Sequence, residues 1–327
     1  MTELVVRAES WPIRGRFTIS RGAKTEAVVV LVELDDGAAC KGYGECVPYA
    51  RYGESPGSVI EQIESLRHDI QQGMDRMHLQ KKLPPGAARN ALDCAFWDLQ
   101  AKMSRQRVWE LLELPSMHPL TTAYTLSLDS PENMYKAALE HADRPLLKLK
   151  LAGEGDIERV RGVRRGAPEA RLIVDANEGW DVGVYRRMVP EMLQLGVEMI
   201  EQPLPAADDE ALRSLHRPIP ICADESCHDS ASLKNLVDRY DMINIKLDKT
   251  GGLTEALELR KAAEAEGMQV MVGCMLATSL AMAPATLLAQ GAAIVDLDGP
   301  LLLERDRRPG LRFDRSLVYP PPRELWG

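Results

Sequence analysis

The chain has 327 residues, 45% hydrophobic and 27% charged, which is enough apolar material for a sizeable folded core. Its formal net charge of -9 argues against general binding to nucleic acids or anionic membranes, because both need a basic surface. The apolar runs have strand length, and the N-terminus MTELVVRAES lacks the basic and apolar regions of a secretory signal. We therefore expect a cytoplasmic protein.

The first third of the chain predicts an α+β unit. Apolar and β-branched runs extend to about residue 46, two of them joined by Asp35-Asp36-Gly37, and these predict an antiparallel sheet. Helical patterns follow at 55–73 and 84–104, with Pro and Gly near their starts. Strands followed by helices are typical of an α+β domain, which we place at residues 1–115.

From residue 116 onward the pattern alternates between strand and helix. Each candidate strand but the last is followed by a stretch long enough for a helix, and there are eight: 122–128, 146–152, 171–177, 197–204, 220–226, 241–248, 269–275 and 293–299. This series favours an α/β fold, a TIM-like (β/α)7β barrel over 116–300, although an open doubly wound sheet would give a similar pattern. The tail, 301–327, has no unit pattern and is expected to return to the capping domain.

Lys148 and Lys150 raise the first question about function, because they lie two residues apart in a leucine-rich strand. Side chains at i and i+2 point to the same face of a strand, so both ammonium groups share one face. Burying an unpaired lysine is costly, and a solvent-facing pair is the ordinary explanation.

Charged residues recur near the C-terminal ends of the predicted strands. Lys150 and Asp175 are 25 residues apart, and the following steps to Glu201, Asp224 and Lys246 are 26, 23 and 22 residues. Each step is about one β/α unit. Side chains at the carboxyl ends of barrel strands converge on one mouth, so we expect these charges to share a site.

Asp175, Glu201 and Asp224 would place three carboxylates at one spot, which requires a cation. Taken singly, each is better explained as a strand-end or turn residue, but three in register argue against that. The six cysteines and six histidines lack the paired spacing of a disulfide framework or a zinc site. Oxygen ligands alone favour Mg²⁺ or Mn²⁺.

Lys150 and Lys246 belong to the second and sixth predicted strands, which lie opposite each other in a ring of eight. A substrate held on the metal would therefore have one lysine on each face. A lysine base must be neutral, and a nearby cation such as Lys148, the metal and desolvation would all favour the neutral form. We interpret Lys148 as the electrostatic partner of a catalytic Lys150.

Six motifs together resemble the enolase superfamily, and within it the muconate-lactonizing subgroup. They are Lys-x-Lys, DANEGW, IEQPLP, ADES, NIKLDKTGG and DLDGPLL, and the resemblance covers nearly the whole chain. It implies one Mg²⁺ per subunit bound by Asp175, Glu201 and Asp224, with Lys150 and Lys246 as the acid/base pair. It also implies that Mg²⁺ stabilises an ene-diolate.

The closing Asp-x-Asp resembles the dipeptide epimerases of this superfamily, in which Asp296 and Asp298 would hold the substrate's ammonium group. The two side chains face the same way and would attract a cation, although Asp298-Gly299-Pro300 is also compatible with a plain turn. The resemblance implies epimerisation of L-Ala-L-Glu to and from L-Ala-D-Glu by 1,1-proton transfer, in murein peptide metabolism.

The same resemblance assigns three further substrate contacts. Arg21, on a cap loop, matches the position that pairs with the glutamate side chain, and Thr125 matches a position that lines the site. Lys148 would help stabilise the ene-diolate. Lys24 and Arg51 are weaker candidates for the Arg21 role, because a cationic loop residue is usually solvated.

Two other classes stay open. Lyases and cycloisomerases of the subgroup, such as o-succinylbenzoate synthase and muconate cycloisomerase, use the same lysines, but their anionic substrates have no ammonium for Asp296 and Asp298. A non-catalytic dipeptide binder would need a lost lysine, and both are present. We expect a small-molecule partner, no nucleic acid and no membrane, and the sequence is compatible with a homo-oligomer.

Overall fold

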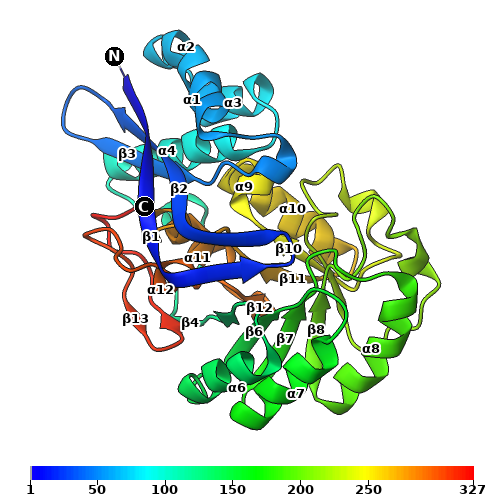
Figure 1. The fold of residues 1–327 in the computed structure, drawn as a ribbon. Coiled ribbons are helices and arrows are strands. Elements are labelled where there is room, and N and C mark those ends of the chain that lie inside the picture. The colour runs from blue at the N-terminus through cyan, green and yellow to red at the C-terminus, as the bar shows by residue number, and fades with distance from the viewer. Residues whose placement is uncertain (1) are drawn as a thin grey trace.

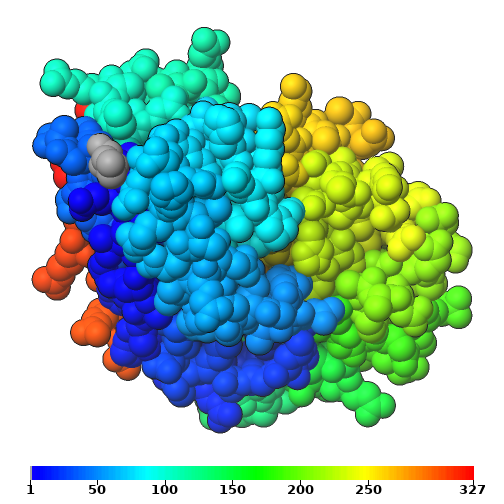
Figure 2. Space-filling model, turned by 90° about the horizontal axis from the view of Figure 1, so that it is seen from above, coloured from blue at the N-terminus to red at the C-terminus, as the bar shows by residue number. Residues whose placement is uncertain are grey.

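The computed structural model describes residues 2–327 and has two parts, a capping domain and a barrel (Figure 1). The N-terminal region forms the cap, and the parallel strands form the barrel. Viewed from above, the blue and cyan cap lies against the green and yellow barrel (Figure 2). None of the helices within residues 2–327 has the length and apolar character needed to cross a membrane.

The cap begins with a three-stranded antiparallel sheet. Its strands are β1 (Glu3–Ile19), β2 (Gly22–Asp35) and β3 (Lys41–Cys46), paired in the order β1-β2-β3. Asp36 Oδ1 accepts hydrogen bonds from three main-chain N–H groups of residues 38–40 and so closes the turn between β2 and β3. The β1–β2 hairpin is long enough to reach from the cap to the barrel (Figure 1).

The remaining cap elements are short helices around one long helix. They are η1 (Ala50–Tyr52), α1 (Pro56–Ser65), α2 (Arg67–Gln71), α3 (Arg76–Lys82), α4 (Ala87–Ser104) and α5 (Val108–Leu111). The predicted helix at 55–73 is therefore two helices, interrupted at Leu66. Helix α4 packs tightly on β3, because a Cβ atom on Gly44 would lie 1.9 Å from the carbonyl oxygen of Ala91.

The barrel contains eight parallel strands in sequence order, which confirms the predicted fold class. They are β5 (Tyr124–Leu126), β6 (Leu146–Lys150), β7 (Arg171–Asp175), β8 (Val197–Glu201), β9 (Ile221–Ala223), β10 (Met242–Ile245), β11 (Gln269–Val272) and β12 (Ile294–Val295). Ala123 N donates to Val295 O at 2.8 Å, so the curled sheet closes between its two end strands.

Helices cover the outside of this sheet (Figure 1). They are α6 (Pro131–Glu140), α7 (Asp156–Gly166), α8 (Val182–Gln194), α10 (Leu253–Ala265) and α11 (Ser279–Leu288). Two short helices follow strands directly, α9 (Leu247–Thr250) after β10 and α12 (Gly299–Leu302) after β12, and they lie on the cap side of the barrel (Figure 1). Pro131 occupies the first turn of α6, where its missing N–H leaves no bond unmade.

The expectation of a full helix after the fourth and fifth strands is wrong. Only single 3₁₀ turns follow β8 and β9, η2 (Glu210–Arg213) and η3 (Leu233–Asn235). Prolines at 203, 205, 218 and 220 leave at most residues 206–217 for a helix after β8. After β9, Ser232 Oγ accepts hydrogen bonds from the N–H groups of His228 and Asp229, which competes with helical bonding.

The C-terminal tail contacts both parts of the molecule. Strands β13 (Phe313–Asp314) and β14 (Leu317–Val318) pair with β4 (Leu120–Thr121) next to the barrel. Farther on, Trp326 Nε1 donates to Cys94 O at 3.0 Å, and Gly327 N donates to Asp98 Oδ1 at 2.7 Å. The end of the chain therefore lies on helix α4 of the cap.

The barrel interior starts with an apolar layer. One buried side chain from or next to each of the eight strands contributes to it: Ala123, Leu146, Ile173, Met199, Cys222, Met242, Met271 and Ile294. Layers of inward side chains are the usual filling of such barrels. This layer supports the site described next.

Candidate active site

A polar layer lies one side-chain period above the apolar layer. Adding two residues to each member of the apolar layer gives Thr125, Lys148, Asp175, Glu201, Asp224, Asn244, Gly273 and Asp296. Residues i and i+2 point to the same side of a strand, so these side chains also face the barrel interior. The seven with side chains are all polar and all buried, which places an unusual amount of charge in the barrel mouth.

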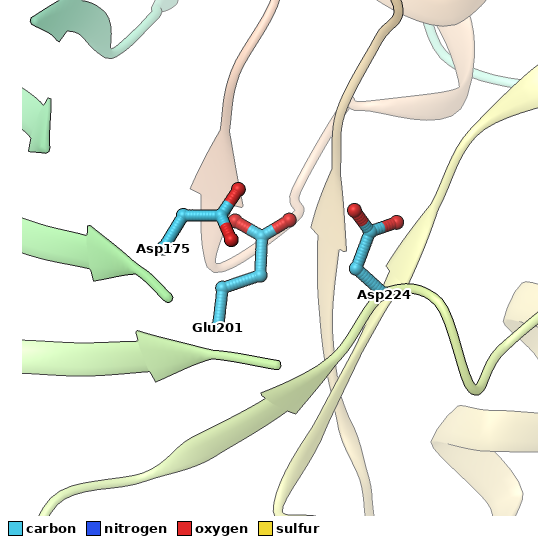
Figure 3. A group of neighbouring side chains, drawn as sticks. All are labelled: Asp175, Glu201 and Asp224. Carbon is cyan, nitrogen blue, oxygen red and sulfur yellow. The ribbon is translucent and has the colours of Figure 1, made fainter. Parts of the chain in front are cut away.

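Asp175, Glu201 and Asp224 lie together at the ends of β7, β8 and β9. One oxygen from each lies within 4.8 Å of the others, and the three carboxylates point toward one another (Figure 3). Burial and neighbouring Asp175 raise the pKa of Glu201 above its usual range. A divalent cation would offset this repulsion, and a cluster of carboxylate oxygens suits Mg²⁺.

Neighbouring side chains orient two of these carboxylates. Asn244 Nδ2 donates to Glu201 Oε1 at 2.7 Å, whereas Glu201 Oε2 has no hydrogen-bond donor among residues 2–327. Lys148 Nζ lies 2.6 Å from that second oxygen, but without the direction of a hydrogen bond. Lys249 Nζ holds Asp224 Oδ1 at 2.6 Å. Glu201 Oε2 is therefore available as a metal ligand, and the three carboxylates are the oxygen ligands that Mg²⁺ prefers.

The two predicted catalytic lysines contact carboxylates on different sides of the triad. Lys150 Nζ donates to Asp175 Oδ2 at 2.6 Å, and Lys246 Nζ donates to Asp224 Oδ2 at 2.6 Å. Burial lowers the pKa of Lys246, but Asp224 and Glu201 outweigh burial and hold the pKa well above its usual value. Lys246 therefore carries a proton that it could give to a substrate.

Lys148 lies among carboxylates. Its Nζ lies 2.7 Å from Asp296 Oδ2 and 3.5 Å from Asp175 Oδ2, in addition to the Glu201 contact. Burial lowers the pKa of Lys148, but these three carboxylates raise it well above its usual value. The ammonium charge is therefore balanced locally, which weakens the predicted effect of Lys148 on Lys150.

Asp296 and Asp298 lie on the β12 side of the mouth and are 4% and 3% exposed. Asp298 Oδ2 accepts a hydrogen bond from Thr125 N at 2.6 Å. Asp296 Oδ1 is buried and has no hydrogen-bond partner within the described part of the chain. An unpaired acceptor of this kind suits a ligand that brings donors, such as an ammonium group.

A cavity of about 610 Å³ opens above this layer, between the cap and the barrel. Its volume falls in the range of about 300–1,000 Å³ that is typical of ligand sites. Eight of the ten predicted site residues line it: Arg21, Thr125, Lys148, Lys150, Asp224, Lys246, Asp296 and Asp298. The other two, Asp175 and Glu201, are fully buried beside it.

The cap contributes three cations to the cavity wall, Arg21, Lys24 and Arg51. Arg21 donates to Glu225 Oε1 at 2.7 Å and to Glu178 Oε2 at 3.2 Å. It lies at the tip of the β1–β2 hairpin, so these bonds attach the cap to the loops after β7 and β9. The structure thus pairs Arg21 with acidic residues of the barrel.

The sequence prediction left out several residues that shape this site. Asn244 lies two residues before Lys246, so the period of two could have placed it inside the barrel. Lys249 lies in helix α9, where that period does not apply. Glu178 and Tyr49 meet Arg21 from distant parts of the chain, which no local pattern reveals.

Comparison with known proteins agrees with this geometry. Residues 1–113 match the mandelate racemase/muconate lactonizing enzyme N-terminal domain, and residues 134–321 match the enolase C-terminal domain-like family. The chain is 48% identical over 321 residues to L-Ala-D/L-Glu epimerase of Escherichia coli, covering 98% of this chain and 100% of that one. It is 47% identical to N-acetyl-D-glutamate racemase of a Pseudoalteromonas species, with 88% and 91% covered.

Solved structures show the same architecture. An enolase family member from Agrobacterium tumefaciens, with homology to dipeptide epimerases and bound sodium and L-Ala-L-Glu, has a TM-score of 0.98. It is 52% identical, with both chains fully covered. A dipeptide epimerase from Enterococcus faecalis, complexed with Mg and L-Leu-L-Tyr, has a TM-score of 0.90 at 29% identity, with 98% of this chain and 96% of that one covered. The chain therefore belongs to the enolase superfamily, in its mandelate racemase/muconate lactonizing enzyme branch, and is related over its full length to the dipeptide epimerases of that branch.

Proposed function

We propose that this protein is a Mg²⁺-dependent dipeptide epimerase that interconverts L-Ala-L-Glu and L-Ala-D-Glu. One observation carries the proposal: Lys150 and Lys246 end β6 and follow β10, with the carboxylates of β7, β8 and β9 between them. Four steps around a ring of eight strands place the two lysines on opposite sides of the mouth. A 1,1-proton transfer needs one acid/base group on each face of the reacting carbon.

Asp175, Glu201 and Asp224 would hold the metal. When bound, Mg²⁺ would act as a Lewis acid toward the dipeptide's terminal carboxylate, and it would offset the charge of Asp224 and Glu201 that raises the pKa of Lys246. Lys150 and Lys246 then exchange a proton with the α-carbon from opposite faces, one removing it and the other returning it. Each lysine serves one configuration of the C-terminal residue.

Asp296 and Asp298 would fix the other end of the substrate. The free oxygen of Asp296 and the carboxylate of Asp298 would accept hydrogen bonds from the dipeptide's ammonium group. Thr125 positions Asp298, and Lys148 lies between the ammonium site and the metal ligands. One end of the cavity, at Asp296 and Asp298, would thus bind the ammonium group of the substrate. The other end, at the metal site, would bind its carboxylate.

N-acylglutamate racemisation is the second candidate, since a relative of nearly equal identity is an N-acetyl-D-glutamate racemase. An N-acetyl group has no ammonium, so it would leave the carboxylate of Asp298 without a cation and the Oδ1 of Asp296 without a donor. The two buried aspartates therefore favour the dipeptide. The lyase and cycloisomerase alternative faces the same objection and has less support among the relatives.

The test is proton NMR in D₂O with enzyme, Mg²⁺ and L-Ala-L-Glu, followed by N-acetyl-L-glutamate and a panel of Ala-Xaa dipeptides. We expect loss of the glutamate α-proton signal, appearance of the L,D diastereomer, and arrest of both by EDTA. Exchange confined to N-acetyl-L-glutamate would support the second candidate. If no substrate exchanges its α-proton, the epimerase proposal is wrong.

The epimerase activity would suit the recycling of murein peptides in the cytoplasm. L-Ala-D-Glu carries the D-residue that murein peptides contain, and its conversion to L-Ala-L-Glu would make it a substrate for ordinary peptidases. A deletion strain grown on L-Ala-D-Glu as sole nitrogen source tests this role. Normal growth of that strain would argue against it.

A further inference from the structure

We infer that Lys24, and not Arg21, is the cap residue that recognises an acidic side chain on the substrate's C-terminal residue. The inference rests on the proposed dipeptide function and names the residue that sets its preference for glutamate. It depends on which of the three cap cations, Arg21, Lys24 and Arg51, is not already paired with a carboxylate of the protein.

The charge of Arg21 is already paired within the protein. Its guanidinium donates to two carboxylates, Glu225 at 2.7 Å and Glu178 at 3.2 Å, and to the Asn177 carbonyl oxygen at 3.0 Å. It also donates to the Tyr49 hydroxyl at 3.2 Å. A guanidinium offers five N–H donors, and four acceptors in different directions occupy it. All four bonds are made by Nη1 and Nη2, so a substrate carboxylate that takes two N–H donors would displace at least one of these acceptors. If that acceptor were Glu225, a buried carboxylate would lose its cation.

Arg51 is also paired, because it forms an ion pair with Glu178 Oε1. Glu178 therefore receives both arginines, one on each oxygen, and additionally accepts a hydrogen bond from Ala206 N at 2.8 Å. These contacts connect the β1–β2 hairpin and the segment at residue 51 to the barrel. We assign Arg21 and Arg51 to holding the cap on the barrel.

Lys24 differs from both. It lines the same cavity, and no carboxylate of residues 2–327 forms an ion pair with it. Its Nζ lies 5.6 Å from the centre of the Tyr49 ring, a contact that leaves the three N–H donors of the ammonium free for a ligand. Lys24 lies opposite Phe17 in the β1–β2 hairpin, so the sheet fixes where its side chain starts.

The expected position of the substrate brings its side chain to this hairpin. The metal site would hold the terminal carboxylate, and the two lysines would face the α-proton. The Asp296–Asp298 pair would hold the ammonium end. The fourth substituent of the α-carbon, the side chain, is then left facing the cap side of the cavity, where Lys24 lies. A glutamate side chain would end in a carboxylate that can pair with a free ammonium.

The test compares kcat/KM for L-Ala-L-Glu with that for its neutral analogue L-Ala-L-Gln. In Lys24→Gln we expect the Glu-over-Gln preference to fall about ten- to hundred-fold, the usual loss for one hydrogen-bonded charge. The loss should appear mainly in KM, because the side chain does not react. Lys24→Arg should restore most of the preference, since it keeps the charge.

Three comparisons make the test decisive. Arg21→Gln should lower kcat/KM for both dipeptides to a similar extent, because the cap contact serves both. Lys81→Gln removes an exposed lysine from helix α3, away from the cavity, and should leave the preference unchanged. Loss of the preference in Arg21→Gln, with retention in Lys24→Gln, would overturn the inference. Failure of the epimerase proposal would appear separately, as wild-type enzyme inactive on both dipeptides.

Discussion

The apolar and polar layers of the barrel interior lie one strand period apart and have opposite chemistry. The lower layer contains only aliphatic residues, methionines and a cysteine, and the layer above it contains Lys148, Asp175, Glu201, Asp224 and Asp296. Both layers are buried, so burial does not distinguish them. The difference is that every charge in the polar layer has an opposite charge beside it, which is the condition for burying charge.

This comparison answers the question raised by the leucine-rich strand. Lys148 and Lys150 share the inward face of β6, while Leu147, Leu149 and Leu151 are buried on the outward face. The lysines are neither solvent-facing nor unpaired, since Asp175 contacts both. The strand is buried on both faces, and one of them is the site.

The largest predicted effect lies in the polar part of the barrel. Lys150→Met and Lys246→Met should each lower kcat for epimerisation by about 10²- to 10⁴-fold, the usual contribution of a general acid or base. Each variant should still exchange the α-proton of the one enantiomer that its remaining lysine serves, as seen by NMR in D₂O. Exchange of both enantiomers by either variant would contradict the two-lysine assignment.

A substitution in the apolar layer should change stability and leave the chemistry in place. Ile173 is fully buried two residues before Asp175, so Ile173→Ala should lower the free energy of unfolding by about 2–5 kcal/mol. Urea unfolding measures this loss, and kcat of the folded fraction should change little. Ile173→Val is the matched control, with an expected loss of about 0.5–1.5 kcal/mol. Equal losses from both would show that the layer is loosely packed.

Asp298 tests the substrate end of the polar site. Asp298→Asn keeps an oxygen to accept the Thr125 N–H but removes the charge. We expect kcat/KM for L-Ala-L-Glu to fall about ten- to hundred-fold, because a charged hydrogen bond to the ammonium is lost. Any activity on N-acetyl-L-glutamate should fall less. An equal fall on both substrates would mean that Asp298 is only a turn residue.

The smallest effect concerns Asp93, a buried carboxylate that forms no ion pair with a lysine of residues 2–327. Lys246 and Lys249 outweigh burial and hold the pKa of Asp224 well below its usual range. Asp93, in helix α4, is also fully buried, and burial raises its pKa to about 6 despite hydrogen bonds from Thr254. The hydrogen bonds from Thr254 thus offset only part of the free energy that the carboxylate loses when it is removed from water.

The sign of the pH dependence follows from that raised pKa. The folded state binds the proton of Asp93 more tightly than the unfolded chain, so stability from this group rises as pH falls from 7 to 5. Wild type should gain about 1 kcal/mol over Asp93→Asn across that interval. Unfolding of both proteins in urea at the two pH values measures the difference. A constant difference between them would show that Asp93 does not titrate there.

Much of the fold could be predicted from the sequence, because its signals are local. The alternation of strand and helix, and the turn at Asp35-Asp36-Gly37, depend on residues close in the chain. The missing helices after β8 and β9 show where this fails. Segment length permitted a helix in both places, but prolines shorten the segment after β8. After β9, the Ser232 and Asp229 side chains accept hydrogen bonds from main-chain N–H groups.

The positions of the candidate metal ligands and of the two lysines were predictable for a similar reason. Strand period and unit spacing place Asp175, Glu201 and Asp224 at one mouth, and the structure brings them within 4.8 Å. Which ions pair with which was not predictable, because an ion pair depends on distances between segments far apart in the chain. Lys148 was expected to act on Lys150, and it instead lies among three carboxylates.

The sequence by itself favoured the barrel and indicated its polar mouth and the residues able to hold a metal, because side-chain direction in a strand repeats every two residues. Only the tertiary structure decided which cap cation is free. Arg21, Lys24 and Arg51 look alike as hairpin and loop residues, and they differ because Glu178 and Glu225 of the barrel neutralise the two arginines. That difference arises from charges that meet only after the cap has folded onto the barrel.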